Sequence, residues 1–223
     1  MLKKDVAMKK ANYSINFSLV LALAMVFTAS CDVNNSTRLS FGERSDLVPN
    51  LHPIDGADNV TVRVNRNNNV SYFDVNLSLI ESGTGIANGK YYGWCANWNA
   101  PIDMERDYDG ITLYSSSDDR NWIKMNYFLN MRDHYVETIE GAGYKEMQSV
   151  VWALIEFNEF DIERDHVLED VDKEAFHAML NDVRENADSF EHTDTTIRAI
   201  LADMSKHETD GKSTQSVIVE VAN

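Results

Sequence analysis

Positive charge is scarce in this chain. Its 20 lysines and arginines are outnumbered by 36 aspartates and glutamates, which gives a formal net charge of −16. Because nucleic-acid binding depends on neutralising phosphates, so acidic a chain excludes nucleic acid as an expected partner. Electrostatic attachment to anionic lipid is disfavoured for the same reason, so we expect any membrane association to come from acyl chains on Cys31.

The sequence near the amino terminus has no apolar run long enough to cross a membrane, since the run from Phe17 to Phe27 is too short. Four lysines precede it, and small residues lead from Thr28 to Cys31, which is the layout of a secretory signal. The segment resembles the lipobox of bacterial lipoproteins, with Thr28 where Leu is usual. We expect residues 1–30 to be a lipoprotein-type signal peptide and Cys31 to be acylated. Plain secretion after ordinary cleavage is the alternative.

Cysteine is equally scarce, because Cys31 and Cys95 are the only two in the chain. If Cys31 is acylated at the surface or in the outer membrane, Cys95 has no intramolecular disulfide partner. A single thiol in an oxidising compartment is a liability unless it is buried or used. Cys95 is therefore the first residue to consider for chemistry.

Polar and turn-forming residues dominate 31–58, which we interpret as a flexible tether before a domain at 59–223. Within the domain, valines alternate with polar residues from Val60 to Val64, and a second alternating stretch covers 73–79. Strands are also expected at 90–95 and 110–115. This first half of the domain reads as antiparallel strands with one buried face.

The period then changes to that of helices. Helices are expected after Asp118 and Asp119, over 145–157, over 168–183, and after Thr193 or Asp194, where Ile197, Ile200, Leu201 and Met204 follow helical spacing. Alternating valines at 217, 219 and 221 predict a closing strand. The order predicts an α+β fold, an antiparallel β-sandwich or barrel with an inserted, mainly helical segment.

Two short motifs stand out by their residue types. The stretch 91–98, Tyr-Tyr-Gly-Trp-Cys-Ala-Asn-Trp, places Cys95 among aromatic residues, and 147–152, Met-Gln-Ser-Val-Val-Trp, opens a predicted helix. This pair resembles the bacterial surface thioester domains, in which a cysteine segment is followed by Thr-Gln-x-Ala-x-Trp. The sequence departs from the family at Met147, Val150 and Asn97, where Thr, Ala and an acidic residue are usual.

The resemblance implies an internal thioester between the Cys95 sulfur and the Gln148 side-chain carbonyl, with Trp152 as the matching aromatic. It implies a surface adhesion protein that transfers the acyl group once to an amine or other nucleophile, on an unknown surface protein or glycan, without enzymatic turnover and without a cofactor. A first-turn position would let unpaired helix N–H groups stabilise the oxyanion on Gln148. Tyr92, Trp94, Trp98 and Trp152 are expected to keep water from the bond.

Other interpretations of the same residues stay open. The serious rival is a non-covalent glycan- or protein-binding lipoprotein that presents Tyr91, Tyr92, Trp94 and Trp98. A cysteine hydrolase pairing Cys95 with a histidine is the weaker rival. Glu105, Asp107 and Asp109 alternate before Gly110 as in the first half of a calcium-binding loop. The twelfth position is Ser116 instead of Glu, so a solvated acidic turn is the better interpretation. The histidines lack metal-ligand spacing, so no metal site is predicted.

Overall fold

The computed structural model describes residues 51–116, 120–155, 160–165 and 168–222. The expected signal peptide, Cys31 and the tether up to residue 50 lie outside the described residues, as do Asp118 and Asp119. Among the helices that are described, none is long and apolar enough to cross a membrane.

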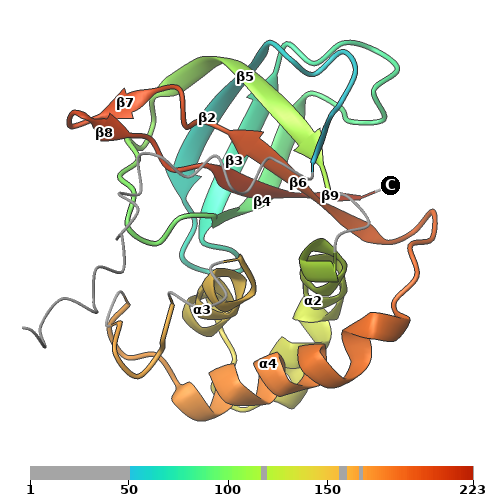
Figure 1. The fold of residues 1–223 in the computed structure, drawn as a ribbon, viewed down its shortest axis with the longest axis vertical. Helices are drawn as coiled ribbons and strands as arrows, with labels where there is room; N and C mark the ends of the chain where they lie inside the picture. Colours follow the sequence, from blue (N-terminus) through green and yellow to red (C-terminus); the bar gives the residue numbers. More distant parts are fainter. Residues whose placement is uncertain (1–50, 117–119, 156–159, 166–167, 223) are drawn as a thin grey trace, which may run out of the picture. The chain divides into compact units, whose positions relative to one another are not determined.

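Six of the described strands form a closed antiparallel β-barrel (Figure 1). They are β2 (Val60–Arg66), β3 (Phe73–Ser78), β4 (Gly89–Cys95), β5 (Asp107–Ser115), β6 (Ile197–Asp203) and β9 (Val217–Ala222). Their order is β5-β2-β3-β4-β9-β6, and β6 pairs with β5 to close the barrel. The alternation read from the sequence fills its interior, since Val60, Val62 and Val64 are fully buried. The expected α+β class, with a barrel and a helical segment, is confirmed.

The folded part begins before the boundary expected at residue 59. Strand β1 (His52–Pro53) pairs with β5, and the side chains of Leu51 and Ala57 are buried. Ala57 also accepts a backbone hydrogen bond from Leu113. The tether interpretation is therefore wrong for residues 51–58. Isolated apolar residues in a polar stretch have no periodicity that would reveal their burial.

Three helices pack together beside the barrel. They are α2 (Arg120–Thr138), α3 (Tyr144–Ile155) and α4 (Lys173–Asn186), followed by the short η2 (Ala187–Ser189). Figure 1 shows α2 and α3 next to the barrel strands and α4 crossing them on the far side. Asp172 caps α4 by accepting a hydrogen bond from the Ala175 N–H. A short hairpin of β7 (Glu208–Thr209) and β8 (Lys212–Ser213) completes the fold.

The last helix expected from the sequence is in fact a strand. Residues from Ile197 onward form β6, which lies between β5 and β9. Ala199 to Ala202 are buried on both faces, so the segment is a continuous apolar run without the alternation that marks a half-buried strand. Side chains from α2 bind its backbone, since the Asn130 carboxamide bonds both the N–H and the C=O of Ile197.

Candidate functional site

Cys95 lies at the end of β4, where one neighbouring strand has stopped. The β3–β4 ladder ends at the pair Phe73 and Gly93, whereas the β4–β9 ladder continues to the pair Cys95 and Val217. On the β3 side, the backbone N–H and C=O of Cys95 therefore need a partner from outside the sheet. The Cys95 side chain is itself only 3% exposed.

Gln148 supplies that partner from α3. Its Oε1 accepts a hydrogen bond from the Cys95 N–H at 2.8 Å, and its Nε2 donates to the Cys95 carbonyl at 2.9 Å. The two residues are 53 positions apart in the chain, and the Gln148 side chain is fully buried. The structure thus brings together the two residues that the sequence singled out. The Gln148 carboxamide therefore makes the two backbone hydrogen bonds to Cys95 that a neighbouring strand would otherwise make.

Trp152 completes the contact from the same helix. One turn after Gln148, it points the same way as the glutamine, and its Nε1–H donates to the Cys95 sulfur at 3.3 Å. The Asn97 carbonyl lies 3.3 Å from the same sulfur and accepts its hydrogen bond. The indole is 1% exposed, so an N–H donor faces the sulfur away from water.

The three residues that differ from the thioester-domain motif each have a structural role in this fold. Met147 and Val150 are 1% and 0% exposed, so both belong to the packing between α3 and its neighbours. The side chain of Asn97 accepts a hydrogen bond from the Ser216 N–H at 3.2 Å, which holds the start of β9 against the turn after Cys95. Asn97 thus has a structural task of its own.

The expected aromatic shield is only partly present. Trp98 packs edge-on against Phe160, with ring centroids 6.4 Å apart, and Phe160 lies 5.6 Å from Trp152. Tyr72, just before β3, also packs edge-on against Trp152, with ring centroids 6.3 Å apart. Sequence patterns did not indicate Phe160 or Tyr72, because neither lies in the two motifs. Their only signal was aromatic character.

Trp94 and Tyr92 lie elsewhere, so their expected shielding role is wrong. Successive side chains of a strand point to opposite faces, and the Trp94 indole N–H donates to Glu220 at 2.7 Å. Glu220 also pairs with Arg132 of α2, whose guanidinium lies over the Tyr92 ring at 4.9 Å from its centroid. Trp94 is fully buried, so it is not presented to a ligand as the rival interpretation required.

The position of Gln148 in its helix also corrects an expectation. It is the fifth residue of α3, and the Met147 N–H before it is already bonded to the Gly143 carbonyl. The N–H that faces Oε1 belongs to Cys95 instead of to the helix terminus. A backbone donor to the carbonyl oxygen is therefore present, but the strand supplies it.

Tyr72 lies close enough to Cys95 for the two groups to interact electrostatically. Burial raises the pKa of its phenol, and the nearby Cys95 raises that pKa further. No cluster of three or more metal-ligating side chains occurs within the residues that the structure places.

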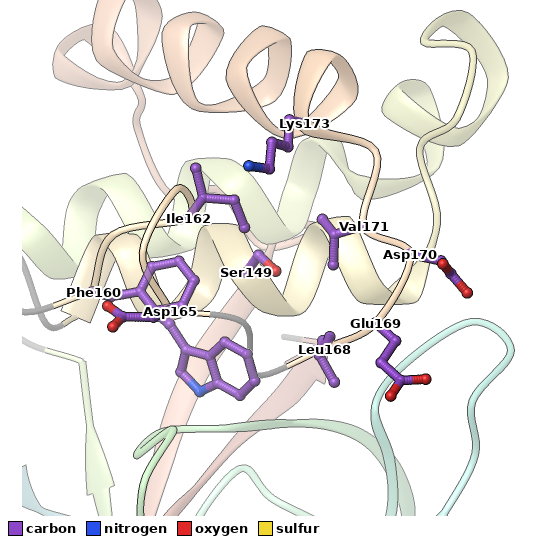
Figure 2. Close-up of a pocket in the computed structure, with 10 residues that line it drawn as sticks. Ser149, Phe160, Ile162, Asp165, Leu168, Glu169, Asp170, Val171 and Lys173 are labelled. Atoms are coloured by element: carbon purple, nitrogen blue, oxygen red, sulfur yellow. The ribbon is translucent and has the colours of Figure 1, made fainter.

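A pocket of about 380 Å³ borders the site on the side of Trp152 (Figure 2). Its walls include Trp152, Phe160, Ile162, Leu168 and Val171, and Ser149, next to Gln148, also lines it. Charged side chains complete the lining, namely Asp165, Glu169, Asp170 and Lys173. Trp152 therefore contacts the Cys95 sulfur and lines the pocket at the same time.

No protein-family model, curated protein or solved structure matches the chain. What the site can do has to be argued from its geometry. A thiol, a carboxamide, an N–H on the carboxamide oxygen and an N–H on the sulfur form one buried group. These are the parts that acyl transfer between a carboxamide and sulfur requires.

Proposed function

We propose that Cys95 and Gln148 form an internal thioester, and that the protein uses it once to attach covalently to a target nucleophile. The observation that carries the proposal is the two-point hydrogen bond between the Gln148 carboxamide and the Cys95 backbone. A buried glutamine held against the one cysteine of the described residues has the right atoms for this bond. The effective concentration of two groups fixed in this way is very high.

Formation of the bond uses the contacts already in place. The Cys95 sulfur attacks the Gln148 side-chain carbonyl carbon, and the negative charge that develops on Oε1 is stabilised by the Cys95 N–H. The C–N bond then breaks and ammonia leaves, carrying the proton that the thiol has lost. The acyl group remains on sulfur, and the carboxamide nitrogen is the only heavy atom released.

Reaction with a target reverses the roles. A nucleophile, such as an amine, attacks the thioester carbon, the C–S bond breaks, and the sulfur leaves with stabilisation from the Trp152 N–H. The products are an amide between Gln148 and the target, and the Cys95 thiol. Because the acyl group is consumed, each molecule acts once, and the protein is not an enzyme in the sense of turnover.

The proposed setting is the bacterial cell surface. A signal peptide at 1–30 and acylation of Cys31 would hold the domain on the membrane, and a thioester domain held there would act as an adhesin. The large excess of acidic residues argues against electrostatic attachment, so the acyl chains would carry the anchoring. The target would be a protein or glycan nucleophile on another surface.

Intact mass tests the bond directly. We would purify the full chain with Cys31→Ala, which removes lipidation and leaves Cys95 as the only thiol. The expected mass is below the sequence mass by one ammonia, and no thiol reacts with a thiol reagent in denaturant. Methylamine should add its mass to Gln148 and expose one thiol.

Cys95→Ser is the matched control, because it keeps the backbone hydrogen bonds to Gln148 and changes one atom. It should show no mass deficit. A wild-type protein that is freshly purified without amines, has the full sequence mass and shows one reactive thiol would rule out an accumulated thioester. The same result would favour a non-covalent binding module.

A further inference from the structure

The pocket beside Trp152 has a composition that suits one kind of group. At about 380 Å³, it lies near the lower end of the range of ligand pockets, so it can take one long side chain or a small molecule. Five of its lining residues are apolar or aromatic. Such walls stabilise methylene groups by removing them from water.

In the part of the chain that the structure describes, two of the carboxylates that line the pocket have no cation bound to them. Lys173 is paired with Glu163 at 2.5 Å and Arg164 with Asp165 at 2.8 Å, whereas Lys145 donates to the backbone carbonyl of Glu169 and not to its carboxylate. Within the described residues, no ion pair or hydrogen bond engages the carboxylates of Glu169 and Asp170, and both residues are exposed. The net charge of −16 on the whole chain adds to the negative electrostatic potential at the pocket.

The pocket also borders the proposed bond, because Trp152 lines the pocket and contacts the Cys95 sulfur. Gln148 is fully buried, so its side-chain carbonyl carbon is reached only if a neighbouring side chain shifts. Trp152 has one edge on the Cys95 sulfur and also borders the pocket. A tilt of this indole that keeps its N–H on the sulfur would open the pocket onto the thioester.

We propose that this pocket is the entrance for the target nucleophile, and that it selects an ammonium group on an unbranched alkyl chain, the form in which a polypeptide presents a lysine. The inference rests on the proposed thioester. Glu169 and Asp170 attract the ammonium group, and Leu168, Val171 and Phe160 contact its methylene chain. The docked group loses one proton to solvent and attacks the carbon as a neutral amine. The products are the amide and the Cys95 thiol.

The ratio of the reaction rates with two amines tests whether the pocket selects a lysine side chain. For the Cys31→Ala chain, we would measure second-order rate constants with Nα-acetyl-lysine amide and with hydroxylamine, which is small and uncharged at neutral pH. The double variant Glu169→Gln/Asp170→Asn should lower the lysine-to-hydroxylamine ratio roughly fivefold, as two exposed charges allow. In the wild type, added salt should lower the ratio as well.

The matched control removes one carboxylate from the other end of α4 and one from the segment after η2, as Glu185→Gln/Glu191→Gln. Glu185 lies about 18 Å along the helix axis from Lys173, given the rise per residue, and both residues are exposed. This variant should leave the ratio within measurement error. Equal ratios in the two double variants would overturn the selection by Glu169 and Asp170.

A second measurement separates this inference from the thioester itself. In Cys95→Ala, which forms no thioester, the lysine compound at millimolar concentration should shift the methyl resonances of Leu168 and Val171. The Glu169→Gln/Asp170→Asn changes should remove that shift. A mass deficit without these shifts would overturn the pocket while the thioester stands. Absence of the mass deficit would remove the acyl transfer and, with it, the role of the pocket as an entrance.

Discussion

The indole N–H of Trp152 points at the sulfur of Cys95 from 3.3 Å, although the two residues come from a helix and a strand 57 positions apart. A donor in this place stabilises negative charge on sulfur, which develops when the thioester breaks. It stabilises a neutral thioester less. The contact therefore favours the transition state of acyl transfer more than the resting state.

Trp152→Phe tests this role of the indole N–H. The substitution keeps an aromatic ring and removes the donor, so we expect the rate of methylamine addition to fall about fivefold, the equivalent of roughly 1 kcal/mol. The mass deficit before methylamine is added should persist. The time course of the intact mass gives the rate. An unchanged rate would show that the N–H does not stabilise the leaving sulfur.

Much of the site could be predicted from the sequence because its signals are local. The valines at 60, 62 and 64 alternate, and the pair Cys95 and Gln148 lies in two short motifs. The fold brings the pair together because the β3–β4 ladder ends at Gly93, so that Gln148 binds the backbone of Cys95 on that side. No pattern in the sequence gives that end point.

The predictions that were wrong, and the residues that were not predicted, also have physical explanations. Trp94 was grouped with the shielding aromatics because it is next to Cys95 in sequence, but adjacent residues of a strand face opposite ways. Strand β6 was read as a helix because a segment buried on both faces loses its alternation. Phe160 reaches the site from the connection between α3 and α4, where tertiary packing alone places it.

Gln148→Ala should destabilise the domain as well as abolish the chemistry. It would leave the N–H and C=O of Cys95 without their partner in a buried place, at a cost of about 1–3 kcal/mol. Cys95→Ser keeps both hydrogen bonds and should cost less than Gln148→Ala. Urea denaturation of both variants measures the difference. Equal losses of stability would show that the carboxamide is not needed to complete the end of β4.

Gly93 is expected to tolerate no side chain, because it faces the packed barrel interior two residues before Cys95. A Cβ built there would lie 2.4 Å from a methyl group of Val75 and 3.2 Å from one of Val217. Gly93→Ala should therefore lower the free energy of unfolding by about 1–3 kcal/mol. It should also disturb the register that positions Cys95.

Gly143→Ala is the control for this change. The nearest atom to its added Cβ is a carboxylate oxygen of Glu146 at 3.2 Å, so the added methyl group meets a much longer contact than the 2.4 Å at Gly93. We expect a smaller effect on the urea midpoint than for Gly93→Ala, and an unchanged mass deficit. If Gly93→Ala were as stable as the control, the barrel interior would have to be less tightly packed than the contacts indicate.

Asp182 of α4 binds two tyrosines of α2, which ties these helices together. Its Oδ2 accepts hydrogen bonds from Tyr127 at 2.8 Å and from Tyr135 at 2.5 Å, and Oδ1 accepts one from Asn186. Burial acts to raise the pKa of Asp182, but these hydrogen bonds outweigh it and hold that pKa below the ordinary value. In turn, burial and the bond to Asp182 raise the pKa of Tyr127 to about 12.

The sign of the resulting pH dependence follows from that lowered pKa. Between the folded and unfolded pKa values, the unfolded chain binds more protons at Asp182, so the contribution of this group is complete above the unfolded pKa and is lost as the pH falls through the folded one. Asp182→Asn should therefore lower stability at neutral pH and flatten its decline below about pH 4. The exposed Asp58→Asn is the control and should keep the wild-type slope. Urea midpoints measured from pH 7 to pH 2 give both curves, and parallel curves for wild type and Asp182→Asn would contradict the assignment.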